Sequence, residues 1–553
     1  MEEEWGREMT DQMKLDVGDS SEGLKRETGF LGLLFTSTGS IIGSGWMLGA
    51  FFCAEYAGPA ALFAWIIGSV VALLLALVFA ELGGLFPVSG GTARFPHYAF
   101  GNLAGASFGW FSWLQAVGTA PIEVEAALQY MSTFETLKWL AYQQVIDGNT
   151  VTILRPAGVG VAVVMLGLFV LLNLYGIRKM TQVNNVITTW KLVVPIMTIV
   201  VLGFTHFQTV NFTSHGFAPY GMHGVLQAVS LGAMFSLVGF EQCVQLAGES
   251  KNPQRDIPRA VIGSLVIGAV LYFILQVVFI AALPGSAFAH GWSSLAFAGS
   301  NGPFAGLAKG LGLVWLAYVL YADALIAPSG SGLCYITTTS RITFGMSKNG
   351  QVPSAFEKIT KKEKVPIVGL FFAWAMGVLL MLPFGGWQSL VGFITSATVL
   401  MYVGGPVSLG ALRKEKPDLF RPFRLPWASV LSPLSFIAAS LVIYWGGWET
   451  DWKLGVAVLL GYLLMGISRL TNANPIKLPL DAKNAIWLGP YLVGMLVISY
   501  FGQFGQGQAD LPDGLDFLVI AAFSLVIYYW AISLRLPASE VDKYAADVYP
   551  VES

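Results

Sequence analysis

The 553-residue chain is strongly apolar: 55% of its residues are hydrophobic, 12% are charged, and its mean hydropathy is +0.64. Soluble globular proteins carry about 25% charged residues, so this composition excludes an ordinary soluble enzyme and a disordered scaffold. The 31 Lys and Arg residues nearly balance the 33 Asp and Glu residues, which leaves no basic surface for a nucleic acid. These features predict a polytopic membrane protein.

The first segment of the chain, residues 1–28, is polar and lacks the apolar stretch of a signal peptide. We expect it to form a cytoplasmic tail. The three cysteines lie far apart and the five histidines form no HExxH pattern. The sequence therefore predicts no disulfide framework, no metal and no cofactor.

Apolar runs of about 20 residues, the length that crosses a bilayer core, recur after this tail. None alternates in polarity like a strand of an outer-membrane barrel, so the predicted fold class is an all-α membrane protein with about fourteen transmembrane helices. The expected spans are 30–52, 59–82, 104–131, 157–176, 185–204, 222–246, 258–282, 305–335, 366–383, 389–411, 428–446, 453–469, 485–501 and 515–534.

The distribution of Lys and Arg predicts the orientation of these spans. With a cytoplasmic N-terminus, 26 of the 31 basic residues fall in cytoplasmic segments and four fall in outer loops. Short cytoplasmic loops of membrane proteins are enriched in Lys and Arg. Both termini are therefore expected in the cytoplasm, and the even number of spans agrees with that.

Two spans contain glycine-rich interruptions. The first span carries GSIIGSGW (39–46), and the sixth carries SLVGFEQ (236–242). Unwound backbone inside a bilayer is tolerated only where protein covers it or where it lines a cavity. If helices 1–5 and 6–10 form two inverted halves, the breaks fall at matching positions, which is the pattern of a transporter binding site. For the first span alone, a GxxxG packing motif is an equal alternative.

Ionisable residues within the spans are expected to have a structural or functional role, because placing each one at mid-membrane costs about 2.5–3.5 kcal/mol. Glu81 and Glu249 lie near cytoplasmic ends and are expected to be solvated or to cap helices. The residues placed deeper are Glu123, Glu125, Lys191, Glu241 and Asp323.

Lys191 lies too deep to reach water easily. Such a lysine can gain and lose a proton near neutral pH, so it is a candidate proton carrier or a fixed cation, and a structural ion pair is an equal alternative. Glu123 and Glu125 are two residues apart and point to different sides of a helix. Asp323 precedes APSGSG (327–332), where we expect a further interruption of the helix.

At these positions the chain resembles the amino acid–polyamine–organocation (APC) superfamily over nearly its whole length. The motifs that carry the resemblance are GSIIGSGW (39–46), ITTWKLVVP (187–195), LVGFEQCVQLAGESKNPQRDIPRA (237–260) and DALIAPSGSGLCYITTTSRITFGMSKNGQVP (323–353). More narrowly, FPVSGGTARFPHYAFG (86–101) and PIEVEAALQY (121–130) resemble the bacterial aspartate–proton symporter branch.

The resemblance implies two inverted five-helix repeats of the leucine-transporter type, with helices 1 and 6 broken around a central site. It implies a transport core at 29–412, four further helices at 413–535 and a cytoplasmic C-terminal tail at 536–553. The superfamily's substrate carboxylate position matches Gly43, Ser44 and Gly45.

Further site residues follow from the same resemblance. Backbone carbonyls near Ile41 and from Phe235 through Ser236 to Val238 would accept bonds from the substrate ammonium. Lys191 matches the lysine that takes the sodium position in proton-coupled members, and Phe240 matches an aromatic gate. The expected proton-coupling residues are Lys191, Glu123 and Glu241.

The expected function is a secondary active transporter, not an enzyme, that imports an amino acid with protons across the bacterial inner membrane. Aspartate or another small amino acid is the expected substrate. The alternatives are an exchanger of neutral amino acids and a non-accumulating sensor or channel. The candidates for reading the substrate side chain are Lys191, Gln115, Gln242, Gln245, Tyr318 and Tyr321. The sequence leaves the oligomeric state open.

Overall fold

The computed structural model describes residues 28–146, 149–175, 177–382, 386–476, 479–512 and 514–546. The expected N-terminal tail before Thr28 and the end of the C-terminal tail (547–553) lie outside the described residues. Within them the fold is helical, apart from one antiparallel hairpin, β1 (Ala141–Ile146) and β2 (Asn149–Leu154), in which Ala141 pairs with Leu154.

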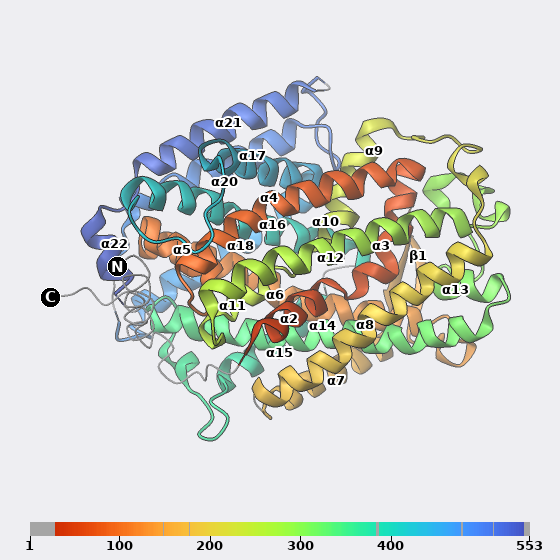
Figure 1. Ribbon diagram of the computed structural model, residues 1–553, viewed down its shortest axis with the longest axis horizontal. Coiled ribbons are helices and arrows are strands. Elements are labelled where there is room, and N and C mark those ends of the chain that lie inside the picture. The colour runs from red at the N-terminus through yellow and green to blue at the C-terminus, as the bar shows by residue number, and fades with distance from the viewer. Residues whose placement is uncertain are drawn as a thin grey trace, which may run out of the picture.

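The α-helices follow one another with short connections (Figure 1). Their bounds are α2 (Phe30–Ile41), α3 (Ser44–Ala57), α4 (Ala61–Leu85), α5 (Gly91–Phe100), α6 (Asn102–Met131), α7 (Pro156–Asn173), α8 (Ile177–Thr205), α9 (Gly221–Ala228), α10 (Met234–Leu237), α11 (Gln242–Gln245), α12 (Pro253–Ala282), α13 (Pro303–Gly310), α14 (Val314–Lys348), α15 (Ile367–Met381), α16 (Trp387–Glu415), α17 (Ala428–Gly446), α18 (Trp448–Leu470), α19 (Ala482–Ala485), α20 (Leu488–Phe501), α21 (Leu515–Ser533) and α22 (Ala538–Tyr544).

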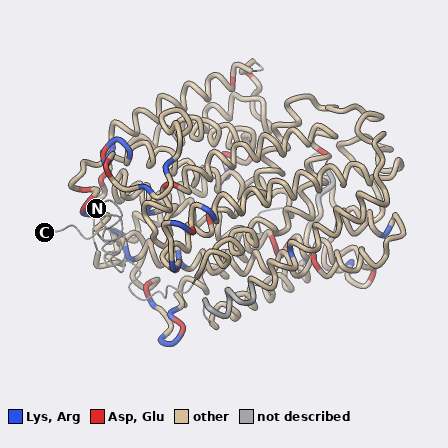
Figure 2. Tube along the Cα trace, in the orientation of Figure 1, with Lys and Arg blue, Asp and Glu red and all other residues tan. Residues whose placement is uncertain are grey.

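The surface of the bundle is suited to a bilayer. Ten described segments are long and apolar enough to cross a membrane. Large apolar side chains point outward from them, as at Leu459 and Leu463 of α18, which are 68% and 59% exposed. Charged residues gather at the end that carries α5 and α22 (Figure 2). We call this the inner end, and the end that carries the hairpin the outer end.

The centre of the bundle is closely packed. The apolar stretch of α16 is entirely buried, and α4 packs along α12 while α6 packs along α14. Helices α17, α20 and α21 lie together on one side of this core (Figure 1). The broken pair α2–α3 therefore lies inside the bundle, where α8, α12 and α14 contact α2.

Two expectations are wrong. Helix α14 runs unbroken from Val314 to Lys348 despite Pro328 and its glycines, because an open backbone in hydrocarbon would cost several kcal/mol per unpaired group. Glu81 and Glu249 are buried rather than solvated: Glu81 forms ion pairs with Arg413 and Arg421, and Glu249 with Arg341. Each carboxylate thus has a cationic partner from a distant segment.

Candidate functional site

The two predicted helix breaks lie against each other. Helix α2 ends at Ile41 and α3 begins at Ser44, while α10 ends at Leu237 and α11 begins at Gln242. Gly239 adopts φ +128°, and a Cβ there would lie 2.7 Å from the backbone nitrogen of Ile41. Only glycine permits both this backbone conformation and this approach.

Glu123 of α6 occupies the N-terminus of α3. Its Oε2 atom accepts a hydrogen bond of 2.7 Å from the backbone N–H of Ser44, and the residue is 3% exposed. Gly43 makes the approach possible, since a Cβ there would lie 2.5 Å from Glu123 Oε1. The N-terminus of a helix carries a partial positive charge and free N–H groups, so it favours a carboxylate. The anion position that the sequence predicted is thus filled by a side chain of the chain itself.

Lys191 of α8 lies at the opposite end of the same break. Its Nζ donates to the Gly39 carbonyl at 2.5 Å and to Ser331 Oγ at 2.8 Å, and Ser331 donates to the same carbonyl at 3.0 Å. The carbonyls at a helix C-terminus carry a partial negative charge. The buried ammonium of Lys191 therefore lies at the C-terminus of α2, and the buried carboxylate of Glu123 lies at the N-terminus of α3.

The other carboxylates that the sequence places within the spans, Glu241, Asp323 and Glu125, make different contacts. Glu241 accepts hydrogen bonds from Tyr402 Oη at 2.6 Å, Gln242 Nε2 at 3.0 Å and its own loop at Gly239 N, also at 3.0 Å. Asp323 accepts one from Trp46 Nε1 at 3.0 Å. Glu125 is buried, and its Oε2 atom has no hydrogen-bond partner among the described residues.

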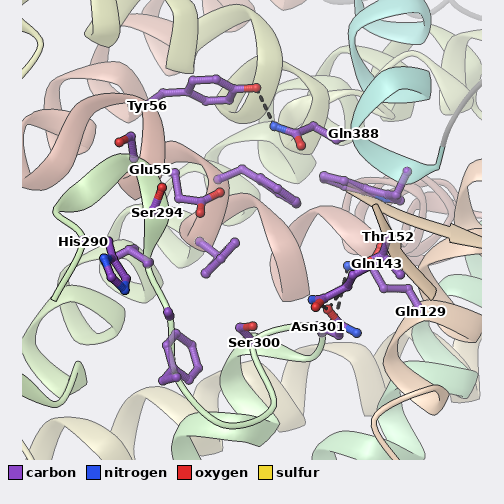
Figure 3. A pocket seen from close by; sticks show the side chains of 17 residues that line it. Glu55, Tyr56, Gln129, Gln143, Thr152, His290, Ser294, Ser300, Asn301 and Gln388 are labelled. Carbon is purple, nitrogen blue, oxygen red and sulfur yellow. Dashed lines mark hydrogen bonds between the residues drawn. The ribbon is translucent and has the colours of Figure 1, made fainter. Parts of the chain in front are cut away.

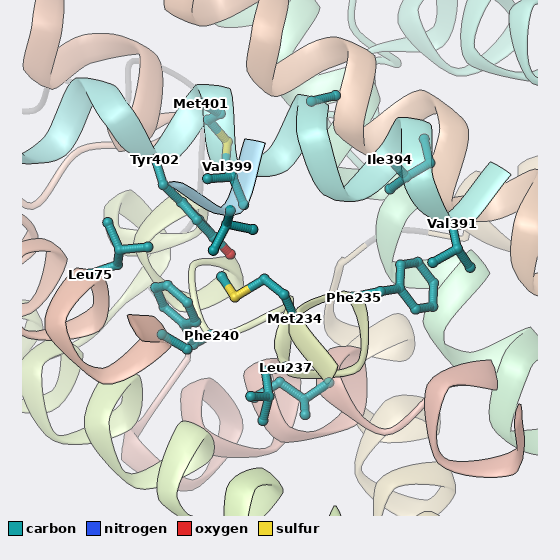
Figure 4. Packing of buried hydrophobic residues seen from close by; sticks show 14 of the residues in the cluster. Leu75, Met234, Phe235, Leu237, Phe240, Val391, Ile394, Val399, Met401 and Tyr402 are labelled. Carbon is teal, nitrogen blue, oxygen red and sulfur yellow. The ribbon is translucent and has the colours of Figure 1, made fainter. Parts of the chain in front are cut away.

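The remaining predicted contacts are arranged as follows. The Ser44 hydroxyl accepts a bond of 3.0 Å from Trp387 Nε1. The Ile41 carbonyl accepts one of 2.7 Å from Tyr272 Oη. Phe240 stacks on Tyr402 at 4.9 Å and is fully buried (Figure 4).

A very small cavity lies between the breaks. Its volume is about 10 Å³, which is room for about one water molecule, and its lining comprises Ser40, Ile41, Gly45, Thr119, Glu123, Phe235, Ser236, Val238 and Tyr335. Phe240 is not among the described residues that line it. The structure thus brings Ile41, Gly45, Phe235, Ser236, Val238 and Glu123 together around one space, with Ser44 next to it.

A larger vestibule of about 360 Å³ opens at the outer end (Figure 3). Its lining includes Trp387 and Phe52, whose rings stack at 5.2 Å, and Phe235 contacts Trp387 edge-on at 5.5 Å. Because Trp387 also binds Ser44, these three rings separate the vestibule from the cavity. Sequence reasoning missed Trp387, which lies 343 residues from Ser44 and belongs to no local motif.

The inner end is closed by contacts between distant segments. Arg341 forms an ion pair with Glu249, and both side chains are buried. Thr28 pairs with Ser250 in a short β-bridge, with hydrogen bonds from Thr28 N to Glu249 O and from Lys251 N to Thr28 O. Among the described residues, these contacts close the bundle between the cavity and the inner end.

These features define a helical membrane protein with a small buried cavity between two broken helices, an arrangement that is typical of secondary transporters. A family model described as amino acid permease matches residues 29–465. The chain belongs to this family, which lies within the APC superfamily, and it is a membrane transport protein rather than an enzyme.

Three relatives from Bacillus subtilis (strain 168) illustrate its place in the family. The chain is 40% identical to the glutamate/serine transporter AimA, over 92% of this chain and 94% of that protein. It is 36% identical to the aspartate-proton symporter, over 92% and 96% of the two chains. It is 28% identical to the branched-chain amino acid permease BcaP, over 80% and 92%.

Proposed function

We propose that this chain imports a small amino acid together with protons across the plasma membrane, with aspartate as one expected substrate. The proposal places it in a bacterial inner membrane with both termini in the cytoplasm. It is supported by the two relatives named for glutamate, serine, aspartate and proton transport. The crowding of charges at the inner end agrees with this orientation (Figure 2).

We further propose fourteen transmembrane helices, ten of them forming two inverted halves over 29–412. Residues 413–535 would add four helices, and the tails would be 1–28 and 536–553. The helix contacts support this division, because the second helices of the halves, α4 and α12, pack together, as do the third helices, α6 and α14.

The observation that carries the proposal is the bond from Ser44 N to Glu123. An amino acid placed at this break needs the N-terminus of α3 for its α-carboxylate. While Glu123 is ionised it competes for that position, because two carboxylates cannot share a buried site without a proton. Protonation of Glu123 removes its negative charge and weakens its interaction with the N-terminus of α3, so the substrate carboxylate can take that position. Substrate binding and proton binding are thereby coupled.

Lys191 supplies the matching cation. It binds Gly39 O and Ser331 Oγ, and so joins α8, α2 and α14 at the end of the break. Loss of its proton would leave a neutral amine, which is a weaker donor, and would thus weaken the links from α2 to α8 and α14 and ease rearrangement of the break. Glu241 is the weakest of the three proposed proton carriers, because three hydrogen bonds already hold its carboxylate in its own helix break.

Uptake into proteoliposomes of the purified chain tests the proposal. Labelled L-aspartate, L-glutamate, L-serine, L-alanine and a polyamine would be offered with and without an inward proton gradient. We expect gradient-driven accumulation of an amino acid, lost in Lys191→Ala and retained in Lys138→Ala, whose lysine is exposed in an outer loop.

The other outcomes separate the alternatives. Accumulation of alanine alone would keep proton coupling and remove acidic substrates. One-for-one exchange without accumulation would replace symport by an exchanger. No flux of any amino acid, with binding retained, would leave a sensor.

A further inference from the structure

Aromatic side chains form a continuous surface in the lining of the outer vestibule. The ring centroid of Phe51 lies 5.3 Å from that of Phe52 and 6.2 Å from that of Phe297. Phe52 in turn stacks on Trp387 at 5.2 Å. We call these four rings the ring surface. The vestibule volume of about 360 Å³ falls within the range of about 300–1,000 Å³ that is usual for small-molecule sites, so the vestibule can hold a ligand against these rings.

Glu55 adds a carboxylate next to the ring surface, and its side chain faces the vestibule (Figure 3). Phe51 and Phe52 precede Glu55 by four and three residues on α3, so both rings lie on its side of the helix. The backbone N–H of Leu295 donates to this carboxylate, which can accept about four hydrogen bonds in all. Glu55 also lies in the last turn of α3, where the helix dipole adds a partial negative charge. Both charges favour a cation at this place.

On the side away from Glu55, the lining is polar but uncharged (Figure 3). Asn301 Oδ1 accepts hydrogen bonds of 2.7 Å from Gln143 Nε2 and 3.2 Å from Thr152 Oγ1. These bonds fix the hairpin β1–β2 to the loop between α12 and α13. Of the described residues that line the vestibule, none is Lys or Arg, and the exposed His290 is the one with a basic side chain. The vestibule therefore lacks a fixed cation that would neutralise the carboxylate.

We propose that the vestibule binds an organic ammonium ion, a primary amine with an aromatic or alkyl body, whose ammonium group lies at Glu55 and whose body lies on the ring surface. An ammonium group donates three hydrogen bonds and is attracted to the faces of aromatic rings. Removal of the apolar body from water stabilises the complex further. An acidic amino acid has a net negative charge, which Glu55 repels. The ligand of the vestibule is therefore distinct from an acidic transported substrate.

A bound amine would also inhibit transport. Phe52 and Trp387 belong to the ring surface and also separate the vestibule from the central cavity. An amine seated on them would stand between the outer solution and the cavity. This inhibition rests on the proposed function, whereas the binding of the amine does not.

Calorimetric titration of the purified full-length chain in detergent tests the binding. Three probes share a phenyl ring and differ in charge: phenethylamine, phenethyl alcohol and phenylacetate. We expect the wild type to bind the amine at least about tenfold more tightly than the alcohol, and phenylacetate most weakly. Glu55→Gln keeps the shape of the side chain but removes its charge, so it should bind the amine and the alcohol about equally. The matched control is Glu135→Gln, which alters an exposed carboxylate of an outer loop and should keep the wild-type preference.

A second variant tests the ring surface. Phe297→Ala removes one of its rings from the loop after α12, and it should weaken binding of the amine about threefold or more. Equal affinity of the wild type for the amine and the alcohol would overturn the proposal. A preference for the amine that persists in Glu55→Gln, or an unchanged affinity for the amine in Phe297→Ala, would also overturn it.

Uptake into proteoliposomes separates this proposal from the proposed function. Phenethylamine should inhibit amino acid uptake by the wild type and should inhibit Glu55→Gln at least about tenfold less strongly. Charge-dependent binding of the amine by a chain that takes up no amino acid would contradict the proposed function and support the vestibule site.

Discussion

Glu123 and Lys191 lie at the two ends of one interrupted helix, each at the end whose dipole favours its charge. The two side chains complete the hydrogen bonding of a break that would otherwise be costly in a bilayer. An amino acid also carries one ammonium and one carboxylate. The break is therefore stabilised by the same two kinds of charge, and under the proposed function a substrate would enter by replacing these side chains as hydrogen-bond partners.

Gly43→Ala tests this arrangement at the scale of one residue. The added Cβ would lie 2.5 Å from Glu123 Oε1 and 2.7 Å from Ser331 Oγ, so Glu123 and Ser331 must move away from the break. Such overpacking costs about 1–3 kcal/mol, and we expect proton-driven uptake in proteoliposomes to fall about tenfold or more. Gly345→Ala is the control, because a Cβ there meets open space. Equal uptake by both variants would show that the position of Glu123 is unimportant.

The residue types of the site were predictable, but their partners were not. Gly39, Gly43 and Gly239 mark the breaks in the sequence, and Lys191 stands out as a cation within an apolar span. The bond between Glu123 and Ser44 joins residues 79 positions apart and depends on how α6 packs against α3. No local pattern carries that information.

At the scale of elements, α5 links the transport helices to the C-terminal tail. At one end, Gly90 N donates to Gln245 O, and Gln245 Nε2 to Thr92 Oγ1. At the other, the ring of His97 lies 4.5 Å from that of Tyr544 in α22. These contacts would therefore transmit a movement of α11 through α5 to α22.

The pH dependence of stability tests this contact. Burial, helped by nearby Arg94, lowers the pKa of His97 to about 3 from 6.5. The folded chain thus keeps this ring neutral, whereas the unfolded chain binds a proton below about pH 6.5. The contribution of the neutral His97 ring to the free energy of unfolding is therefore complete above pH 6.5 and declines as the pH falls towards 3.

We expect the thermal unfolding midpoint in detergent to drop between pH 7.5 and 5, and to drop less in His97→Gln. His206→Gln alters a histidine of the loop after α8, which lacks this burial, and should follow the wild type. If His97→Gln and the wild type show the same pH slope, the neutral ring contributes nothing.

Two elements differ from what the sequence patterns predicted, the continuous helix α14 and the hairpin. The unbroken α14 was missed because Pro328 and four hydroxyl or glycine neighbours read as a helix end in water, while the bilayer penalises an open backbone. The hairpin was missed although AYQQVI and NTVTIL flank an Asp-Gly pair, which is a strong hairpin signal.

At the scale of the whole molecule, the conformation is closed at the inner end and open as far as Trp387 at the outer end. The vestibule contains about 360 Å³, the central cavity about 10 Å³. Under the proposed function, substrate binding would therefore widen the cavity by moving Trp387 and Glu123. Release at the inner end, as proposed, would require separation of Arg341 from Glu249.

The central claim is that protonation of Glu123 couples substrate entry to proton entry. It is tested most directly by a pH-sensitive dye inside proteoliposomes while the substrate is added outside. We predict that substrate acidifies the interior in the wild type and in Glu135→Gln, whose carboxylate is exposed in an outer loop. Glu123→Gln should retain substrate exchange but lose the acidification. Unchanged proton entry per transported substrate in Glu123→Gln would contradict the account.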